Sequence, residues 1–390
     1  MNNRNVYIDY TTVIDLEKDI GTYTGAGSYT RDVISVLKEY GVNFKILVYT
    51  GFVPQKSYER ELMPDEDMLI GIKDITDFVF SDGDVLFLPV ITGRILAKAD
   101  RIKRKYVYLK IYAVIHDRQH NISHFDPMDS YFYEGIYRSA LVLYVKYMIK
   151  RLVYDCFYPK WIKAIDKVFA VSNYTLQALE HKNLKSITYL YQSTSVARCT
   201  PCQTPEYDDI GEYILFVSGG RPEKNLGRAL IAFRDFCKEA DTKCKLCITG
   251  IDREKLHYLA DRLKLSHEFT DEHIKSYDYV STDELAYLYK NCRYLLFVSK
   301  GEGFGLPVLE AIQFGKTVLC SRQSAIPEVA GSILYYVDAF NVSSIKEGMI
   351  YLNDDKNLIY REKLVEKKKK IIDEQIELDK HVLVGEIVEK

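Results

Sequence analysis

Short apolar runs alternate with segments of helical periodicity along the first half of the chain. The runs that predict strands cover residues 6–10, 44–49, 85–88, 107–115 and 167–171. Between the first two runs lies a polar loop, followed by an amphipathic helix that starts at Tyr29 and stops at Gly41. Strands that alternate with helices predict an α/β domain, in which helices cover both faces of a parallel sheet.

The same alternation restarts in the second half of the chain. Strands are predicted at 213–218, 245–249, 294–299, 317–321 and 333–337, and helices at 225–236 and 253–263. Residues 195–211 are polar, contain two prolines and lack periodicity, which is typical of a linker. The charged tail keeps regularly placed apolar residues, so we expect a terminal helix that packs on a domain surface. The predicted parts are therefore 1–195, a linker at 196–211, a second domain at 212–359 and a helical tail at 360–390.

Composition narrows the possible functions. The 390 residues are 47% hydrophobic and carry a net charge of −2, which argues against a nucleic-acid partner. No apolar run approaches the ~18 residues of a membrane-spanning helix, and the first residues do not resemble a secretory signal. We therefore expect a cytoplasmic protein. Cys199 and Cys202 form one C-x-x-C pair, and Cys244 and Cys247 form another. The second pair lies on a predicted strand, where residues three apart point to opposite faces, so free thiols are favoured over a zinc site.

The most informative loop is SKGEGFGLPVLEAIQFG, residues 299–315. Gly301, Gly303 and Gly305 follow a predicted strand, and Leu306-Pro307 then opens a helix. Glycines allow close approach of the backbone, and a helix start offers N–H groups to an anion, so a diphosphate is the expected guest. Carboxylates would repel phosphate. We therefore interpret Glu302 and Glu310 as binding hydroxyl groups, one on a sugar ring and one on a ribose.

These residues resemble a known family. Glu302-x7-Glu310 within EGFGLPVLEA resembles the signature of family 4 retaining glycosyltransferases, which have the GT-B fold. The segments 324–331 (SAIPEVAG) and 279–289 (YVSTDELAYLY) resemble further motifs of that family, in the same order. The resemblance covers the C-terminal half almost continuously. It implies two Rossmann-like, doubly wound domains that face each other across a donor cleft.

The first loop of the second domain, residues 218–225, adds basic groups. Arg221 and Lys224 precede a predicted helix, and the family places a basic residue and a K-N or K-G step in this loop. The alternative is that this loop is only a solvated basic turn and binds no ligand. The resemblance implies that Lys224 and Arg221 stabilise the leaving diphosphate. The predicted donor-binding residues of this domain are Gly219, Gly220, Asn225, Gly303, Phe304, Gly305, Leu306 and Glu310.

The N-terminal half carries weaker matches. The glycine loop of Gly25, Ala26 and Gly27 resembles the family loop near the donor phosphates; it lacks the third glycine of a dinucleotide fingerprint. His116-Asp117 follows a strand, as in the family, where the histidine approaches the donor sugar. Ser172 either binds a substrate or caps the helix after it. His116, His120 and His124 are spaced by four, but a metal-binding helix is disfavoured by the residues between and after them.

The segment 138–165 is aromatic, apolar and basic. A basic amphipathic helix can lie on a membrane surface, and many relatives use lipid-linked acceptors. Relatives also carry a basic core helix here. We favour packing over membrane contact, and keep the inner face of the membrane open as a location.

The resemblance implies a hexosyltransferase that moves a sugar from a nucleotide diphosphate sugar to a glycan or lipid-linked acceptor in surface polysaccharide biosynthesis. Retention by a front-face route, domain closure and independence from metal ions or other cofactors are expected. His116, Glu302, Lys224 and Arg221 are the predicted catalytic residues. The alternatives are a degenerate sugar-nucleotide-binding protein and an epimerase of the same fold. A periplasmic-type sugar-binding protein is disfavoured because no signal segment is evident.

Overall fold

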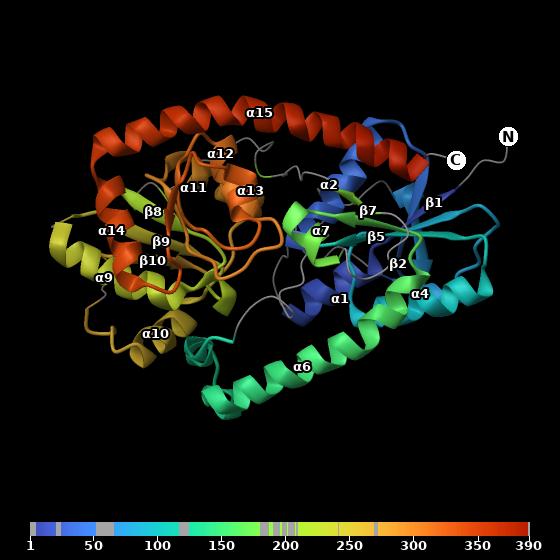
Figure 1. Ribbon diagram of the computed structural model, residues 1–390, viewed down its shortest axis with the longest axis horizontal. Coiled ribbons are helices and arrows are strands. Elements are labelled where there is room, and N and C mark those ends of the chain that lie inside the picture. Colours follow the sequence, from blue (N-terminus) through green and yellow to red (C-terminus); the bar gives the residue numbers. More distant parts are fainter. Residues whose placement is uncertain are drawn as a thin grey trace. The chain divides into compact units, whose positions relative to one another are not determined.

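The computed structural model describes residues 5–20, 25–51, 66–116, 125–179, 187–189, 196, 201, 207, 210–240, 242–268 and 272–388. The chain divides into two compact units (Figure 1). Unit 1 comprises residues 1–118, 151–194 and 374–390, and unit 2 comprises 119–150 and 195–373. The domain limits read from the sequence stay predictions. In the structure, 119–150 group with the second unit and the end of the tail groups with the first.

Unit 1 is built on a parallel sheet of seven strands in the order β3-β2-β1-β4-β5-β6-β7. The strands are β1 (Val6–Asp9), β2 (Phe44–Tyr49), β3 (Leu69–Ile72), β4 (Val85–Leu88), β5 (Lys110–Ile115), β6 (Lys167–Ala170) and β7 (Ile187–Tyr189). The helices are α1 (Thr11–Ile20), α2 (Gly25–Glu39), α4 (Gly93–Lys105), α6 (Ala140–Trp161) and α7 (Asn173–Leu179), the first half of α6 belonging to unit 2. The core is aliphatic, with β4 buried at every position.

Two sequence predictions in unit 1 are wrong. The segment after β1 is the helix α1 rather than a polar loop, and the Gly25–Gly27 loop is the first turn of α2. The fully buried Asp9, at the end of β1, is the reason that a helix starts directly after this strand. Its carboxylate accepts hydrogen bonds from the backbone and hydroxyl of Thr11 and from the hydroxyl of Thr12, and so satisfies donors of the first turn.

Unit 2 repeats the design with six parallel strands in the order β10-β9-β8-β11-β12-β13. The strands are β8 (Tyr213–Phe216), β9 (Lys245–Thr249), β10 (Ile274–Tyr277), β11 (Leu295–Phe297), β12 (Val318–Ser321) and β13 (Tyr335–Val337). The helices are α9 (Leu226–Ala240), α10 (Arg253–Arg262), α11 (Thr282–Asn291), α12 (Leu306–Gln313), α13 (Ile326–Ala330), α14 (Val342–Asn353) and α15 (Asp355–Val388), the part of α15 from residue 374 onward belonging to unit 1. In both sheets the strand order reverses beside the first strand, as in Rossmann-like folds.

The charged tail belongs to α15, a helix of 34 residues. Val365, Ile372, Ile376, Leu383 and Ile387 are buried along one side of it, at spacings of seven, four, seven and four. This repeat gives the helix a continuous apolar stripe to pack, despite its many lysines. The tail is thus helical and partly buried, and its place as a separate part of the chain on a domain surface stays a prediction.

The basic segment at 138–165 forms α6, but the expectation that it packs as a core helix is wrong for its first half. Among the described side chains from 140 to 153, only Leu143 is buried. Leu141, Val145 and Ile149 are 70%, 49% and 58% exposed. None of the helices in the described part of the chain is long and apolar enough to cross a membrane.

Close packing of α14 on the second sheet gives a direct test of unit 2. A Cβ on Gly348 would come within 2.5 Å of Leu319 and 2.8 Å of Val337. We expect Gly348→Ala to lower the free energy of unfolding by about 1–3 kcal/mol, because the buried side chains of Leu319 and Val337 must shift to accept the added methyl group. Gly385→Ala in α15 is the control, since its Cβ meets no atom within 4 Å and helix propensity favours alanine. Equal effects in urea titrations of the two variants would contradict this packing.

Candidate active site

The loops that carry the sequence motifs follow β8 and β11, two neighbouring strands of the second sheet. Leu215 of β8 pairs with Leu295 of β11, at the point where the strand order reverses. Loops after such strands leave the sheet in opposite directions and open a crevice at its carboxyl edge, where α/β proteins bind ligands. Because of the strand order, the motif at 218–225 and the motif at 299–305 therefore begin side by side at this edge.

Gly219 and Gly220 are required by close packing after β8. A Cβ on Gly219 would lie 2.6 Å from Ile248, and one on Gly220 would lie 2.6 Å from the Gly250 carbonyl oxygen. Their N–H groups donate to the carbonyls of Thr249 and Gly250, at 2.8 and 2.9 Å. These two N–H groups are thus used inside the protein, and a donor-binding role for the two glycines stays a prediction.

Asn225 ties three parts of the unit together. It has a left-handed backbone, with φ of 69°, and is 2% exposed. Its amide donates to the carbonyls of Val298 and Ala339, and its oxygen accepts from Arg228. Asparagine tolerates the left-handed region better than most residues. The arrangement makes Asn225 a positioning residue for both motif loops, whereas the sequence predicted a donor contact.

The two motif loops are also joined directly. The Lys300 N–H and the Ser299 hydroxyl both donate to the carbonyl of Glu223, at 2.8 and 3.0 Å. Ser321 at the end of β12 donates to the Ser299 carbonyl at 2.6 Å. These bonds hold the start of the glycine loop against the basic loop, so the two segments form one rigid edge.

Lys224 and Glu302 meet at this edge. The Lys224 Nζ lies 2.5 Å from a Glu302 carboxylate oxygen, and the residues are only 7% and 9% exposed. The ammonium also lies 5.0 Å from the centre of the Phe297 ring. A lysine ammonium has three donors, and Glu302 takes one of them. The predicted diphosphate binder and the predicted sugar-hydroxyl binder are therefore adjacent, and each reduces the cost of burying the other.

The glycine loop ends at the start of α12. Gly305 has φ of 102°, a conformation that side-chain-bearing residues rarely adopt, and it precedes the first helical residue, Leu306. Phe304 is 4% exposed, so its ring belongs to the protein interior. The segment from Gly303 to Leu306 thus presents backbone and the positive end of the α12 dipole.

Glu310 lies one turn into α12 and is buried. The Tyr289 hydroxyl of α11 donates to its carboxylate at 2.7 Å. Burial raises the pKa of Glu310 to about 7, although the Tyr289 hydrogen bond and the Lys224 charge oppose the rise. The free protein therefore holds this carboxyl partly protonated at neutral pH, and a hydroxyl-bearing ligand meets a group that both accepts and donates hydrogen bonds.

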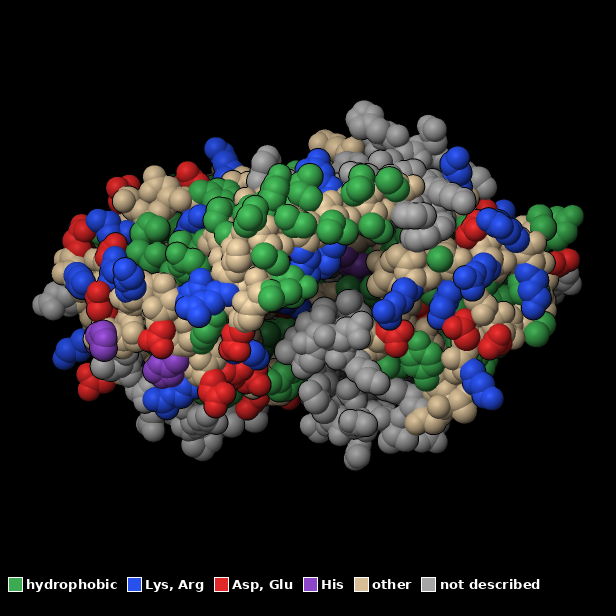
Figure 2. Space-filling model, turned by 90° about the horizontal axis from the view of Figure 1, so that it is seen from below, with side chains coloured by type: hydrophobic (Ala, Val, Ile, Leu, Met, Phe, Trp, Pro, Cys, Tyr) green, Lys and Arg blue, Asp and Glu red, His purple; other side chains and the backbone are tan. Residues whose placement is uncertain are grey.

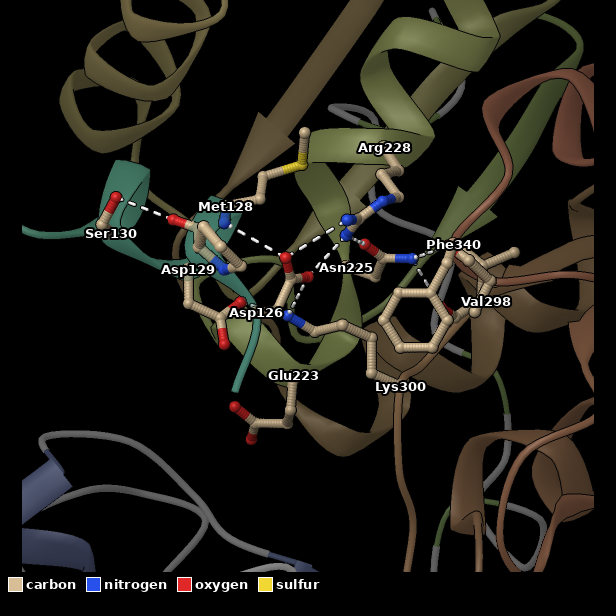
Figure 3. A network of polar contacts seen from close by, with 12 residues as sticks. Asp126, Met128, Asp129, Ser130, Glu223, Asn225, Arg228, Val298, Lys300 and Phe340 are labelled. Atoms are coloured by element: carbon tan, nitrogen blue, oxygen red, sulfur yellow. Dashed lines mark hydrogen bonds and ion pairs between the residues drawn. The ribbon is translucent and has the colours of Figure 1, made fainter. Parts of the chain in front are cut away.

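Beside this edge lies a charge network that sequence reasoning missed (Figure 3). Asp126, from the segment before α6, contacts Arg228 of α9 at 2.5 Å and Lys300 of the glycine loop at 3.0 Å. Lys300 also pairs with Asp129. Burial would raise the pKa of Asp126, but the Arg228 and Lys300 contacts outweigh it and hold the pKa at about 2. No local motif signals these pairs, because Asp126 and Lys300 are 174 positions apart.

In unit 1, His116 follows β5 as predicted and is partly buried. Its Nε2 lies 2.8 Å from the Pro89 carbonyl oxygen, which can only accept, so Nε2 carries the proton. Burial lowers the pKa of His116 to about 4. The imidazole is therefore neutral at physiological pH, and its unprotonated Nδ1 is an acceptor for a hydroxyl group. The Tyr29 ring meets it edge-on, with centroids 4.9 Å apart.

The other residues singled out in the N-terminal half fall into three groups. Ser172 accepts a hydrogen bond from the Thr175 N–H at 3.0 Å and is completely buried, which is the geometry of the helix-cap alternative for α7. Gly25, Ala26 and Gly27 open α2. Asp117, His120 and His124 lie outside the described residues.

The structure describes one of the two C-x-x-C pairs, because Cys199 and Cys202 lie outside the described residues. Cys244 joins the core on the α9 side of the second sheet, while Cys247 is completely buried in β9, and both are free thiols. Burial raises the pKa of Cys244 to about 12. Within the described part of the chain, no group of three or more histidine, cysteine or acidic side chains is placed to hold a metal ion.

Comparison with known proteins finds a family match over the part of the chain that contains both motif loops. Residues 205–371 match the family described as glycosyl transferases group 1. The chain is 30% identical over 169 residues to the O-antigen chain mannosyltransferase B of Escherichia coli, covering 42% of this chain and 43% of that one. It is 27% identical over 178 residues to the serotype-specific mannosyltransferase WbdA of Escherichia coli, covering 43% and 22%. The matches span less than half the length of either relative.

Solved structures match over the whole chain. Sucrose-phosphate synthase from Thermosynechococcus elongatus has a TM-score of 0.69 at 11% identity, covering 98% of this chain and 97% of that one. A glycosyltransferase from Rickettsia africae has a TM-score of 0.65 at 15% identity, with both chains fully covered. At such identities the likeness shows the fold alone. The chain has the GT-B fold, and residues 205–371 are similar to the group 1 glycosyltransferases.

The raised pKa of Glu310 predicts a pH-dependent stability. Its pKa is about 7 in the folded protein against 4.5 ordinarily, so the folded state binds the proton more tightly. The associated stability is present below pH 4.5 and is lost as the pH rises through 7. Glu310→Gln keeps the acceptor for Tyr289 and removes the titration. We expect the variant to gain up to about 3 kcal/mol over the wild type between pH 5 and 8, at ~1.4 kcal/mol per pKa unit.

Urea unfolding of the free protein across this pH range measures the difference. Tyr289→Phe serves as a second variant, because loss of its hydrogen bond raises the Glu310 pKa further and moves the pH dependence upward. Parallel stability profiles for the wild type and Glu310→Gln would contradict the assignment.

Proposed function

We propose that the chain is a retaining glycosyltransferase that transfers a hexosyl unit from a nucleoside diphosphate sugar to a glycan or lipid-linked acceptor. The observation that carries the proposal is the convergence of Lys224, Glu302 and the α12 start at the reversal point of the second sheet. That part of the chain also matches the group 1 glycosyltransferases.

Lys224 is assigned to the leaving diphosphate. As the bond between the anomeric carbon and the diphosphate oxygen breaks, negative charge grows on that oxygen. Two ammonium donors beyond the one used on Glu302 can stabilise this charge, together with the positive end of α12. Arg221, which begins the turn before Lys224, adds a second cation to the same loop. These groups supply the electrostatic stabilisation without a metal ion, so we propose that no cofactor is required.

Glu302 and Glu310 are assigned to hydroxyl groups. Glu302 is fixed by Lys224 and presents its other carboxylate oxygen to a sugar hydroxyl near the reacting carbon. Glu310, set further into α12, binds the ribose. His116 keeps the role that the resemblance implies, with Nδ1 accepting from a hydroxyl of the donor sugar. In the front-face route, the acceptor oxygen forms the new bond to the anomeric carbon, and its proton passes to the departing phosphate oxygen.

We propose mannose as the transferred sugar and a surface polysaccharide as the product. Two relatives that match part of this chain are mannosyltransferases, one of them of an O-antigen chain. A mannose-terminated oligosaccharide is accordingly the first acceptor to test, with nucleoside diphosphate mannose as donor.

Removal of the assigned groups tests the proposal. We expect Lys224→Ala and Glu310→Ala each to lower the rate of transfer by more than tenfold, about 1.4 kcal/mol or more of transition-state stabilisation. Release of the nucleoside diphosphate in the presence of acceptor measures the rate. Lys255→Ala is the matched control, because this lysine is largely exposed and lies in the same unit. Rates near the wild type in both site variants would reject the assignment.

A double variant separates the loss of the lysine charge from a loss of folding stability. Lys224→Ala leaves the Glu302 carboxylate buried without its cation, which alone can destabilise the unit. The double variant Lys224→Met/Glu302→Gln removes both charges and preserves packing. We expect it to fold and to transfer no faster than Lys224→Ala. Recovery of activity in the double variant would show that the lysine serves only to balance Glu302.

A further inference from the structure

Asp126 joins parts of unit 2 that are far apart in sequence (Figure 3). Its carboxylate accepts two hydrogen bonds from the Arg228 guanidinium, at 2.5 and 3.2 Å, and one from the Lys300 ammonium at 3.0 Å. The backbone N–H of Met128 is a further donor, at 3.1 Å. The Asp126 side chain is only 5% exposed, so these donors take the place of water around a buried charge.

The segment 126–133, from which this carboxylate comes, is itself held on α9 and α10. Met128 packs at Gly227, where a Cβ would lie 3.2 Å from the methionine sulfur. The Tyr258 hydroxyl of α10 donates to the Tyr133 carbonyl at 2.9 Å. Helix α6, which follows, is exposed along most of its first half, and Figure 2 shows hydrophobic side chains gathered on the face that it presents. The contacts with α9 and α10, rather than burial of α6, therefore hold the segment in place.

Lys300 is tied at both its backbone and its side chain. Its N–H donates to the Glu223 carbonyl at 2.8 Å, in the basic loop. Its ammonium pairs with Asp126 and Asp129, and its side chain is only 8% exposed. Glu302 lies two residues further along the chain, so the position of Lys300 limits where the Glu302 carboxylate can lie.

The Arg228 branch of the network reaches the same loop through Asn225. The Arg228 Nη1 donates to the Asn225 side-chain oxygen at 3.1 Å, and the Asn225 amide donates to the Val298 carbonyl at 3.1 Å. Val298 directly precedes the glycine loop. Asp126 is therefore connected to the start of this loop through Arg228 and to its interior through Lys300.

We propose that Asp126 is a positioning residue of the candidate active site: it anchors Lys300 and thereby holds Glu302 where its carboxylate reaches the donor sugar. Asp126 itself touches no substrate and acts only through the glycine loop. The benefit to catalysis rests on the proposed function, whereas the anchoring of the loop is a property of the free protein. A purely structural Asp126 would stabilise unit 2 and leave the loop and the rate of transfer unchanged.

Hydrogen exchange in the free protein tests the anchor without any turnover. Asp126→Asn keeps the shape of the side chain and removes a charge that is present at every assay pH, because the pKa of Asp126 is about 2. We expect the amides of residues 300–305 to exchange about tenfold faster in this variant, since the bond from the Lys300 N–H to the Glu223 carbonyl opens more often. Unchanged exchange in this segment would overturn the proposal.

Turnover separates positioning from stability. At a temperature where both proteins are fully folded, we expect Asp126→Asn to lower kcat about tenfold and to change the KM of the acceptor by less than about threefold. Glu212→Gln is the matched control, because it breaks an ion pair with the largely buried Arg293 at the amino edge of the same sheet. The control should lower the free energy of unfolding and leave kcat and the exchange of 300–305 unchanged. An equal fall of kcat in the control would show that lost stability alone is responsible.

A double-mutant cycle tests whether the effect passes through Lys300. Lys300→Gln should lower kcat by a similar factor, and Asp126→Asn/Lys300→Gln should be no slower than the slower single variant. Losses that multiply in the double variant would contradict the anchor. A wild type that transfers no sugar would reject the proposed function instead, and the exchange of residues 300–305 would still decide whether Asp126 positions the loop.

Discussion

The pairing of β8 with β11 is the constraint on which the candidate site depends. Because these strands are neighbours although β9 and β10 lie between them in sequence, the loops after them begin side by side. The two loops are then fixed by bonds to the Glu223 carbonyl and by Asn225, which reaches Val298 and Ala339. Backbone geometry therefore sets the positions of Lys224 and Glu302 before any ligand arrives, which is the preorganisation that electrostatic catalysis requires.

The charges at this edge are arranged in pairs rather than as an open cationic pocket. Lys224 is balanced by Glu302, and Lys300 by Asp126 and Asp129. Burial of single charges would be costly, so pairing keeps the free site stable. Burial also raises the pKa of Glu310 to about 7, and partial protonation of this carboxyl lowers the negative charge near the two loops. If the proposed function holds, the diphosphate of the donor meets groups that already have their positions.

Sequence patterns predicted the central strands of both units well, because these are continuous apolar runs. They missed β3, β7 and β10, which lie at sheet edges and are only three or four residues long; β3 and β10 are also only partly buried. The motif loops were found because glycine, proline and charged residues mark them locally. The Lys224–Glu302 pair and the contacts of Asp126 depend on partners 78 and 174 positions away, so only the fold reveals them. The apolar and basic composition of α6 was visible in the sequence, but the exposure of its first half depends on tertiary packing.

The most direct test of the central claim is the change in melting temperature of the free protein with nucleoside diphosphates, measured without metal. A ligand that binds only the folded state raises the melting temperature once its concentration exceeds the dissociation constant. We expect one of GDP, UDP, dTDP and ADP to raise it, the matching monophosphate to raise it much less, and the Lys224→Met/Glu302→Gln variant to lose that difference. Equal shifts with diphosphate and monophosphate, or no shift with any of the four, would contradict a diphosphate site between the loops after β8 and β11.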